Sequence, residues 1–73
     1  MFDLKKIVSG SSQVSQVEYS TSVKTLRVTF INGSVYDYLN VPRGAYDGLI
    51  KANSVGGYLT LYIKNRFTYQ KVS

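Results

Sequence analysis

Cationic and aromatic residues are interleaved near the end of the sequence. The segment contains Lys64, Arg66, Phe67, Tyr69 and Lys71. Cations of this kind bind phosphate groups, and aromatic rings offer faces on which nucleobases stack. The competing interpretation is an edge strand, in which the aromatic rings pack inward while the solvated cations block pairing with another sheet. We favour the edge strand and keep RNA binding as the alternative.

Two tyrosines and an arginine form a second candidate site. Tyr36 and Tyr38 with Arg27 can form a base-stacking platform if they lie together on an exposed sheet face. The same tyrosines can instead belong to the core, because their spacing places both on one face of a strand. We expect core packing. RNA binding, if present, is assigned to Arg27, Lys64, Arg66, Tyr69 and Lys71.

The first eight residues mix apolar side chains with two lysines. Phe2, Leu4 and Ile7 surround Lys5 and Lys6 without a decisive period. Apolar anchors beside cations can enter a groove of a partner protein while steering toward its acidic surface. The alternative is an ordinary mobile terminus. We predict a partner-binding site made of these five residues, which Lys64 and Arg66 extend.

The residue types argue against catalysis. The chain has no His and no Cys, so the commonest general base and the thiolate nucleophile are both missing. The four carboxylates are scattered along the sequence; they are Asp3, Glu18, Asp37 and Asp47. We therefore expect no enzymatic activity, no metal site and no cofactor.

Length and charge narrow the class further. A chain of 73 residues is one small domain, and its net charge of +5 favours nucleic acid or an acidic protein surface as partner. No apolar run approaches the roughly 20 residues that a membrane-spanning helix needs. We expect a monomeric protein of the cytoplasm.

The strongest structural pattern is a hairpin from Leu26 to Tyr38. Apolar residues alternate before Asn32-Gly33, which supplies the positive φ that a tight turn needs. A two-residue loop would place Asp37 among apolar groups, whereas a three-residue loop pairs Phe30 with Ser34. The second register sends Arg27, Thr29 and Asp37 to water. We favour it.

The remaining patterns predict an α+β fold. Three consecutive antiparallel strands are expected at about 16–20, 25–31 and 35–39, with an edge strand in the C-terminal tail. Pro42 and the apolar spacing after it indicate a helix from residue 42 to residue 52. Residues 55–63 also fit a helix, although alternation there leaves a strand possible. The predicted architecture is a small sheet of three strands plus the C-terminal strand, packed with two short helices.

The sequence resembles the KTSC domain family over about residues 9–71. The residues that carry the resemblance are Ser11-Ser12, Tyr19, Leu26, Val28, Phe30, Gly33, Tyr36, Tyr38, Val41-Pro42, Tyr46, Leu49, Ala52, Ser54, Gly56, Tyr58, Ile63 and Tyr69. The resemblance implies one domain over residues 9–73 preceded by a segment at 1–8. It also implies three strands, helices and a final strand. RNA binding has been proposed for this family, which occurs alone or as an extension of lysyl-tRNA synthetases.

The length, charge and motifs also resemble those of small phage-encoded transcription regulators within that family. This resemblance implies binding to the large subunits of bacterial RNA polymerase, in the cytoplasm of the host cell. It further implies inhibition of initiation by displacement of σ, and support of antitermination. We take the polymerase-binding regulator as the first expectation and the RNA-binding accessory module as the alternative.

Overall fold

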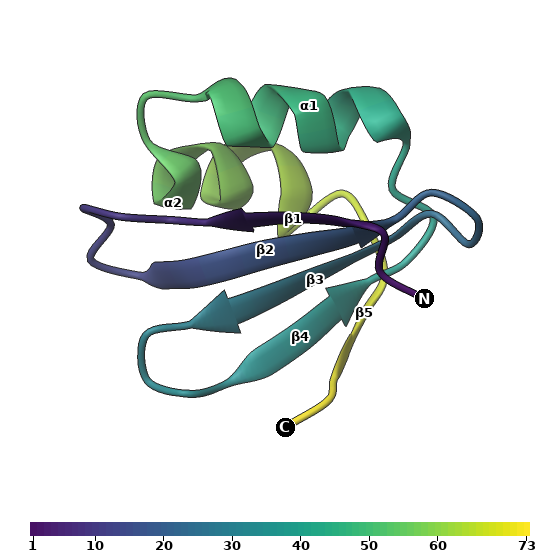
Figure 1. Cartoon of the computed structure of the whole chain (residues 1–73), viewed down its shortest axis with the longest axis horizontal. Helices are drawn as coiled ribbons and strands as arrows, with labels where there is room; N and C mark the ends of the chain where they lie inside the picture. The colour runs from purple at the N-terminus through teal and green to yellow at the C-terminus, as the bar shows by residue number, and fades with distance from the viewer.

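The computed structural model describes residues 1–73, which form one antiparallel sheet covered on one face by helices (Figure 1). The five strands follow one another in space in sequence order, β1-β2-β3-β4-β5. They are β1 (Leu4–Ile7), β2 (Val14–Ser20), β3 (Thr25–Phe30), β4 (Val35–Tyr38) and β5 (Tyr69–Lys71). The helical segments are α1 (Arg43–Lys51), α2 (Val55–Tyr58) and the π-helical turn η1 (Leu59–Ile63). We call the helix-covered face of the sheet the inner face and the opposite one the outer face.

The predicted sheet of three strands plus a C-terminal strand is wrong. The sheet has five strands, because residues 4–7 form β1 along the free edge of β2. Leu4 lies opposite Tyr19 and packs against the core, and Lys6 lies opposite Val17. Asp3 fastens the start of this strand, since its carboxylate accepts hydrogen bonds from the Thr21 backbone at 2.9 Å and the Thr21 hydroxyl at 2.6 Å.

The register predicted for the central hairpin is confirmed. Leu26 pairs with Tyr38 and Val28 with Tyr36, and the Phe30 N–H donates to the Ser34 carbonyl at 2.8 Å. Gly33 has φ +93°, a left-handed conformation that side-chain-bearing residues rarely adopt. The turn therefore has three residues, and this count fixes which side chains share the inner face.

One consequence drawn from that register is wrong. Asp37 does not extend into water but is only 6% exposed on the outer face. Its carboxylate accepts two hydrogen bonds from Arg27, at 2.7 and 2.9 Å. A buried carboxylate needs such a partner to offset the loss of hydration.

Both predicted helices are present. Tyr46 and Leu49 of α1 are buried, as the apolar spacing predicts. The second helical segment starts at Ser54, whose side-chain oxygen accepts from the Gly57 N–H at 3.0 Å. It continues from α2 into η1 without a break, and Leu59 and Ile63 are fully buried.

The core lies between the inner face of β1–β4 and the helices. Tyr19 and Tyr46 stack there with ring centroids 5.0 Å apart, and the Tyr19 hydroxyl donates to the Val41 carbonyl. The buried apolar residues are Val14, Val17, Tyr19, Leu26, Val28, Tyr38, Val41, Tyr46, Leu49, Val55, Leu59 and Ile63. The helices end before they reach the far corner of the sheet, so part of the inner face stays open.

Candidate functional site

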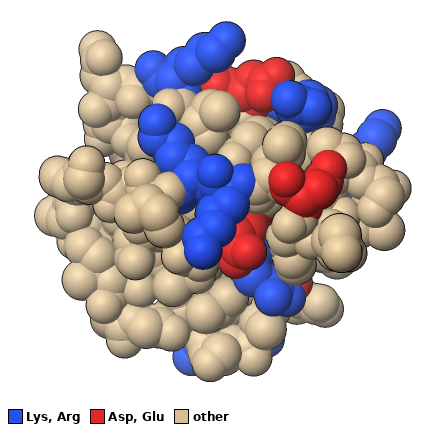
Figure 2. Space-filling model, in the orientation of Figure 1, with Lys and Arg blue, Asp and Glu red and all other residues tan.

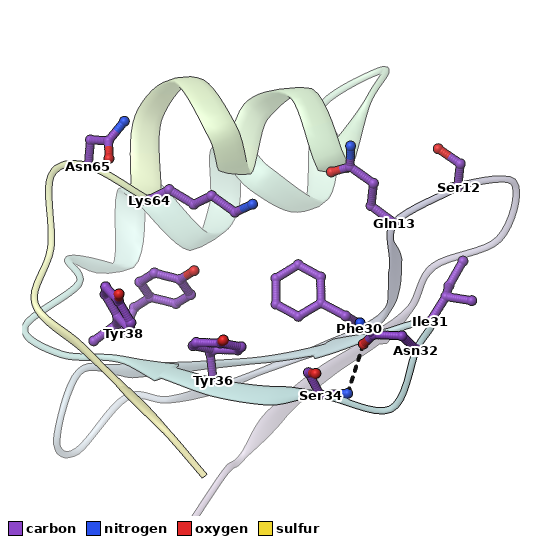
Figure 3. Close-up of a pocket in the computed structure, with 11 residues that line it drawn as sticks. Ser12, Gln13, Phe30, Ile31, Asn32, Ser34, Tyr36, Tyr38, Lys64 and Asn65 are labelled. Atoms are coloured by element: carbon purple, nitrogen blue, oxygen red, sulfur yellow. Dashed lines mark hydrogen bonds between the residues drawn. The ribbon is translucent and has the colours of Figure 1, made fainter. Parts of the chain in front are cut away.

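An open cleft of about 700 Å³ occupies the part of the inner face that the helices leave uncovered (Figure 3). Its floor is formed by strands β3 and β4, and β5 and the end of η1 form one side. We call it the aromatic cleft because its apolar lining is mainly Phe30, Tyr36, Tyr38 and Tyr69. Its polar lining residues are Ser12, Gln13, Asn32, Ser34, Lys64 and Asn65.

The four rings form a connected set. Phe30 meets Tyr36 edge to face at 5.7 Å between centroids, with the ring planes at 88°. Tyr69 lies 5.6 Å from Tyr36 and 5.8 Å from Tyr38. Tyr38 is almost fully buried, and burial raises its pKa, whereas Tyr69 is 56% exposed. The set thus runs from the core out to the solvent and presents ring faces to the cleft.

The π-helical turn positions the cation of the cleft. The Lys64 N–H donates to the Leu59 carbonyl at 2.9 Å, a bond that spans five residues instead of the four of an α-helix. The Lys64 side chain then extends beneath the helix, with Nζ 5.5 Å from the centre of the Phe30 ring. Figure 3 shows this ammonium on the helix side of the cleft, opposite Tyr36 on the sheet.

The hairpin turn contributes an amide at the other end of the cleft. Asn32 Oδ1 accepts from the Ser34 N–H at 3.0 Å, which orients the side-chain amide. Its NH₂ group is the free end, and Figure 3 shows the nitrogen on the Phe30 side. The chemistry of the cleft is therefore aromatic and hydrogen-bonding, with one cation.

The residues predicted to bind RNA are divided between the two faces. Lys64 and Tyr69 line the aromatic cleft, and Lys71 pairs with Tyr36 and so projects from the same face. Arg66 is exposed in the turn after η1. Arg27 lies on the outer face, bonded to Asp37, which raises the pKa of the guanidinium. The structure therefore separates Arg27 from the other four.

The residues predicted to bind a partner protein also fall on both faces. Leu4 and Lys6 project from the inner face of β1, and Lys5 and Ile7 from the outer face. The Phe2 ring is covered by the Arg27 guanidinium, 4.4 Å from its centroid. Lys64 lies in the cleft instead, and Arg66 follows η1. Partner binding by these seven residues stays a prediction.

Sequence reasoning missed most of the cleft. Phe30, Gln13, Asn32 and Asn65 were not candidates, and Tyr36, half-buried in the structure, was assigned to the core. The three-residue turn was the available signal, since it places Phe30 and Tyr36 on one face beside the turn amide. The sequence pattern does not indicate how far the helices extend over the sheet, so it could not show that this part of the face stays open.

On the face shown in Figure 2 the charges do not form one continuous basic surface. In Figure 2 acidic side chains lie among the basic ones across the visible face, and a broad uncharged area adjoins them. The structure has no group of three or more His, Cys, Asp or Glu side chains placed to hold a metal ion. None of its helices combines the length and the apolar character needed to cross a membrane.

Comparison with known proteins identifies the family. The family model described as KTSC domain matches residues 10–67. Lysine–tRNA ligase of Trichormus variabilis is 36% identical over 62 residues, and that of Nostoc punctiforme 34% identical over 62 residues. These residues are 85% of this chain, which spans only 11% of the length of either ligase.

Two further relatives match nearly from end to end. A protein of Tsukamurella paurometabola is 32% identical over 57 residues, covering 78% of this chain and 85% of its own length. The crystal structure of a KTSC domain protein from Yersinia pestis superposes with a TM-score of 0.87 at 30% identity. That match covers 96% of this chain and 97% of the other. The chain therefore belongs to the KTSC domain family.

Proposed function

We propose that this protein is a non-catalytic module that binds single-stranded RNA in the aromatic cleft. The observation that carries the proposal is that four aromatic rings line an open cleft together with a cation that has no ion-pair partner. Sheet-borne aromatic side chains that stack successive bases are a recurrent way of holding single-stranded RNA. Stacking tolerates any base, because every base has a π-face.

The placement of the cations supports the same proposal. Lys64 reaches into the cleft, and Lys71 projects from the inner face beside Tyr36. Neither forms an ion pair within the protein, so both are free to meet phosphate groups. The curated relatives named lysine–tRNA ligase act on an RNA, and they carry the matching segment as a small part of their length.

A titration of labelled single-stranded RNA, followed by fluorescence anisotropy, tests the proposal. Tyr69→Ala removes an exposed ring of the cleft and should weaken binding by about tenfold, within the range measured for loss of one stacked base. Tyr62→Ala is the matched control, because Tyr62 is 49% exposed on η1 and does not line the cleft. Equal affinities of the two variants, or no binding by the native protein, would contradict the proposal.

A second candidate is the transcription regulator that binds bacterial RNA polymerase, inhibiting initiation and supporting antitermination. The observation that favours it is the free edge of β1. Lys5, Lys6 and Ile7 are exposed there, Ile7 by 64%, and one edge of the strand has no neighbour in the sheet. Such an edge can accept an extended segment of another protein.

Affinity capture from a bacterial lysate distinguishes the two candidates. Retention of the large polymerase subunits after nuclease treatment, and their loss with Ile7→Asp, would support the polymerase regulator. Tyr69→Ala serves as the control, since it alters the cleft and leaves β1 intact. Polymerase that is released by nuclease treatment would instead indicate a contact through RNA.

A further inference from the structure

The hydrogen-bonding groups of the aromatic cleft are biased toward donors. The Asn32 oxygen is directed toward the turn, where it accepts from the Ser34 N–H, so the NH₂ group is the part of the amide that lies toward Phe30 and the cleft (Figure 3). A flipped amide would leave that N–H facing another N–H, so the orientation is fixed by the backbone. The turn thus orients the donor end of the Asn32 amide toward the cleft.

Lys64 adds a group that can only donate. An ammonium has three N–H donors and no acceptor. It lies over the Phe30 ring rather than against a carboxylate, and neither ion pair of the protein includes it. No Asp or Glu lines the cleft, so no carboxylate there can accept from a bound base. The remaining polar groups are amides and hydroxyls, which donate or accept as the ligand requires.

Nucleobases differ in the groups that they would present to such a lining. Guanine offers the O6 and N7 acceptors, and the uracil ring, like that of thymine, carries an O4 acceptor. Adenine shares the N7 acceptor with guanine, but adenine and cytosine carry an amino donor where guanine and uracil carry the keto oxygen. An amino group facing Asn32 Nδ2 or Lys64 Nζ would place donor against donor and leave both without their partner.

We infer that the aromatic cleft selects keto bases, uracil and guanine, over amino bases, with the Asn32 amide and the Lys64 ammonium as the selecting groups. This inference rests on the proposed RNA binding and adds the class of base to it. Tyr36 and Tyr69 provide the stacking surface, which is indifferent to the base, and the two donors provide the discrimination.

Matched pairs of oligonucleotides test this preference. Oligouridylate is compared with oligocytidylate, and inosine-substituted RNA with its adenosine counterpart, so that ring size stays constant within each pair. The native protein should bind the keto member about tenfold more tightly, within the range found for base-edge discrimination. A ratio near one with measurable binding would overturn the inference and leave the RNA-binding proposal intact. No binding to any oligonucleotide would overturn both.

Variants assign the preference to the two donors. Asn32→Asp keeps an oxygen for the Ser34 N–H but replaces the free NH₂ by an acceptor, so the keto preference should disappear. Asn53→Asp adds the same charge on the loop between α1 and α2, outside the cleft, and should weaken all RNAs alike without changing the ratio. Lys64→Met should reduce the preference as well. A keto preference that survives both Asn32→Asp and Lys64→Met, in variants that keep the native circular dichroism spectrum, would overturn the inference.

Discussion

The two halves of the inner face of the sheet carry similar apolar and aromatic side chains, but one half is buried and the other lines a cleft. In the covered half, Leu26 and Val28 are fully buried beneath the helices. In the open half, Phe30, Tyr36 and Tyr69 lie on the same face but line a cleft. Alternation along a strand specifies which side chains share a face. Whether that face becomes core or binding surface depends on how far the helices extend over it.

Truncation of one side chain in each half tests whether the two halves contribute differently to stability, and it should give the largest effect. Leu26→Ala should lower the free energy of unfolding by about 3 kcal/mol, because the side chain is fully buried and leaves a cavity. Tyr69→Ala should cost about 1 kcal/mol or less, since more than half of its surface is already solvated. Urea denaturation of both variants measures the difference. Equal losses would mean that the open half belongs to the core.

The turn that joins β3 to β4 offers the second test. Gly33→Val should destabilise the protein by about 2 kcal/mol, because a β-branched residue is strained at φ +93°. A Cβ at this position would meet no neighbouring atom within 4 Å, so the expected cost comes mainly from the backbone. Gly44→Val is a useful reference, since its site is equally open and lacks the positive φ. A smaller loss for Gly33→Val than for Gly44→Val would contradict the bulged turn.

The outer face of the sheet supplies a third test. Arg27→Met leaves the Asp37 carboxylate without its two hydrogen bonds. The expected loss is about 1 kcal/mol, because solvent reaches the exposed part of the pair and partly replaces the guanidinium. Adding Asp37→Asn should recover part of this loss, which thermal melts of the single and double variants would detect. RNA affinity should be unaffected, in contrast to Lys64→Met.

Alkaline titration gives the smallest effect. Burial raises the pKa of Tyr19, Tyr38 and Tyr46, each of which contributes to the covered core. The unfolded chain ionises these groups near pH 10, before the folded protein does. Their contribution to stability is therefore complete below about pH 10 and declines as the pH rises toward the folded pKa values. Denaturation midpoints across this range should fall less steeply in Tyr46→Phe than in the native protein, and an identical slope would contradict burial as the cause.

Local chemistry made the hairpin predictable from the sequence. Asn32-Gly33 dictates a turn with positive φ, and only one loop length keeps Asp37 off the apolar face. The same reasoning failed for β1. Lys6 projects from the inner face and Ile7 from the outer one, so the strand lacks the expected alternation. Residues 4–7 form a strand because they pair with the free edge of β2. Pairing with a strand elsewhere in the sequence cannot be predicted from the local pattern of side chains.

The cleft was less predictable because it depends on helix length in three dimensions. The apolar spacing from Val55 to Ile63 fits an α-helix, and nothing in it indicates a π-helical turn at Leu59–Ile63. At α-helical spacing Tyr62 would share an apolar face with Tyr58, Leu59 and Ile63, but it is half exposed. The extent of the helices over the sheet, and hence the open half of the inner face, follows from packing between distant segments.

The π-helical turn makes the cleft sensitive to insertion and deletion. Each residue of an α-helix advances the chain by about 100° around the axis. Loss of one residue between Leu59 and Ile63 would restore ordinary helical geometry and swing Lys64 away from Phe30 by about that angle. Many substitutions at the exposed positions Thr60 and Leu61 would leave the direction of the Lys64 side chain around the helix axis unchanged. The position of the Lys64 ammonium over Phe30 therefore depends more on the number of residues in the π-helical turn than on their identity. Insertions and deletions in this turn should be less tolerated than substitutions.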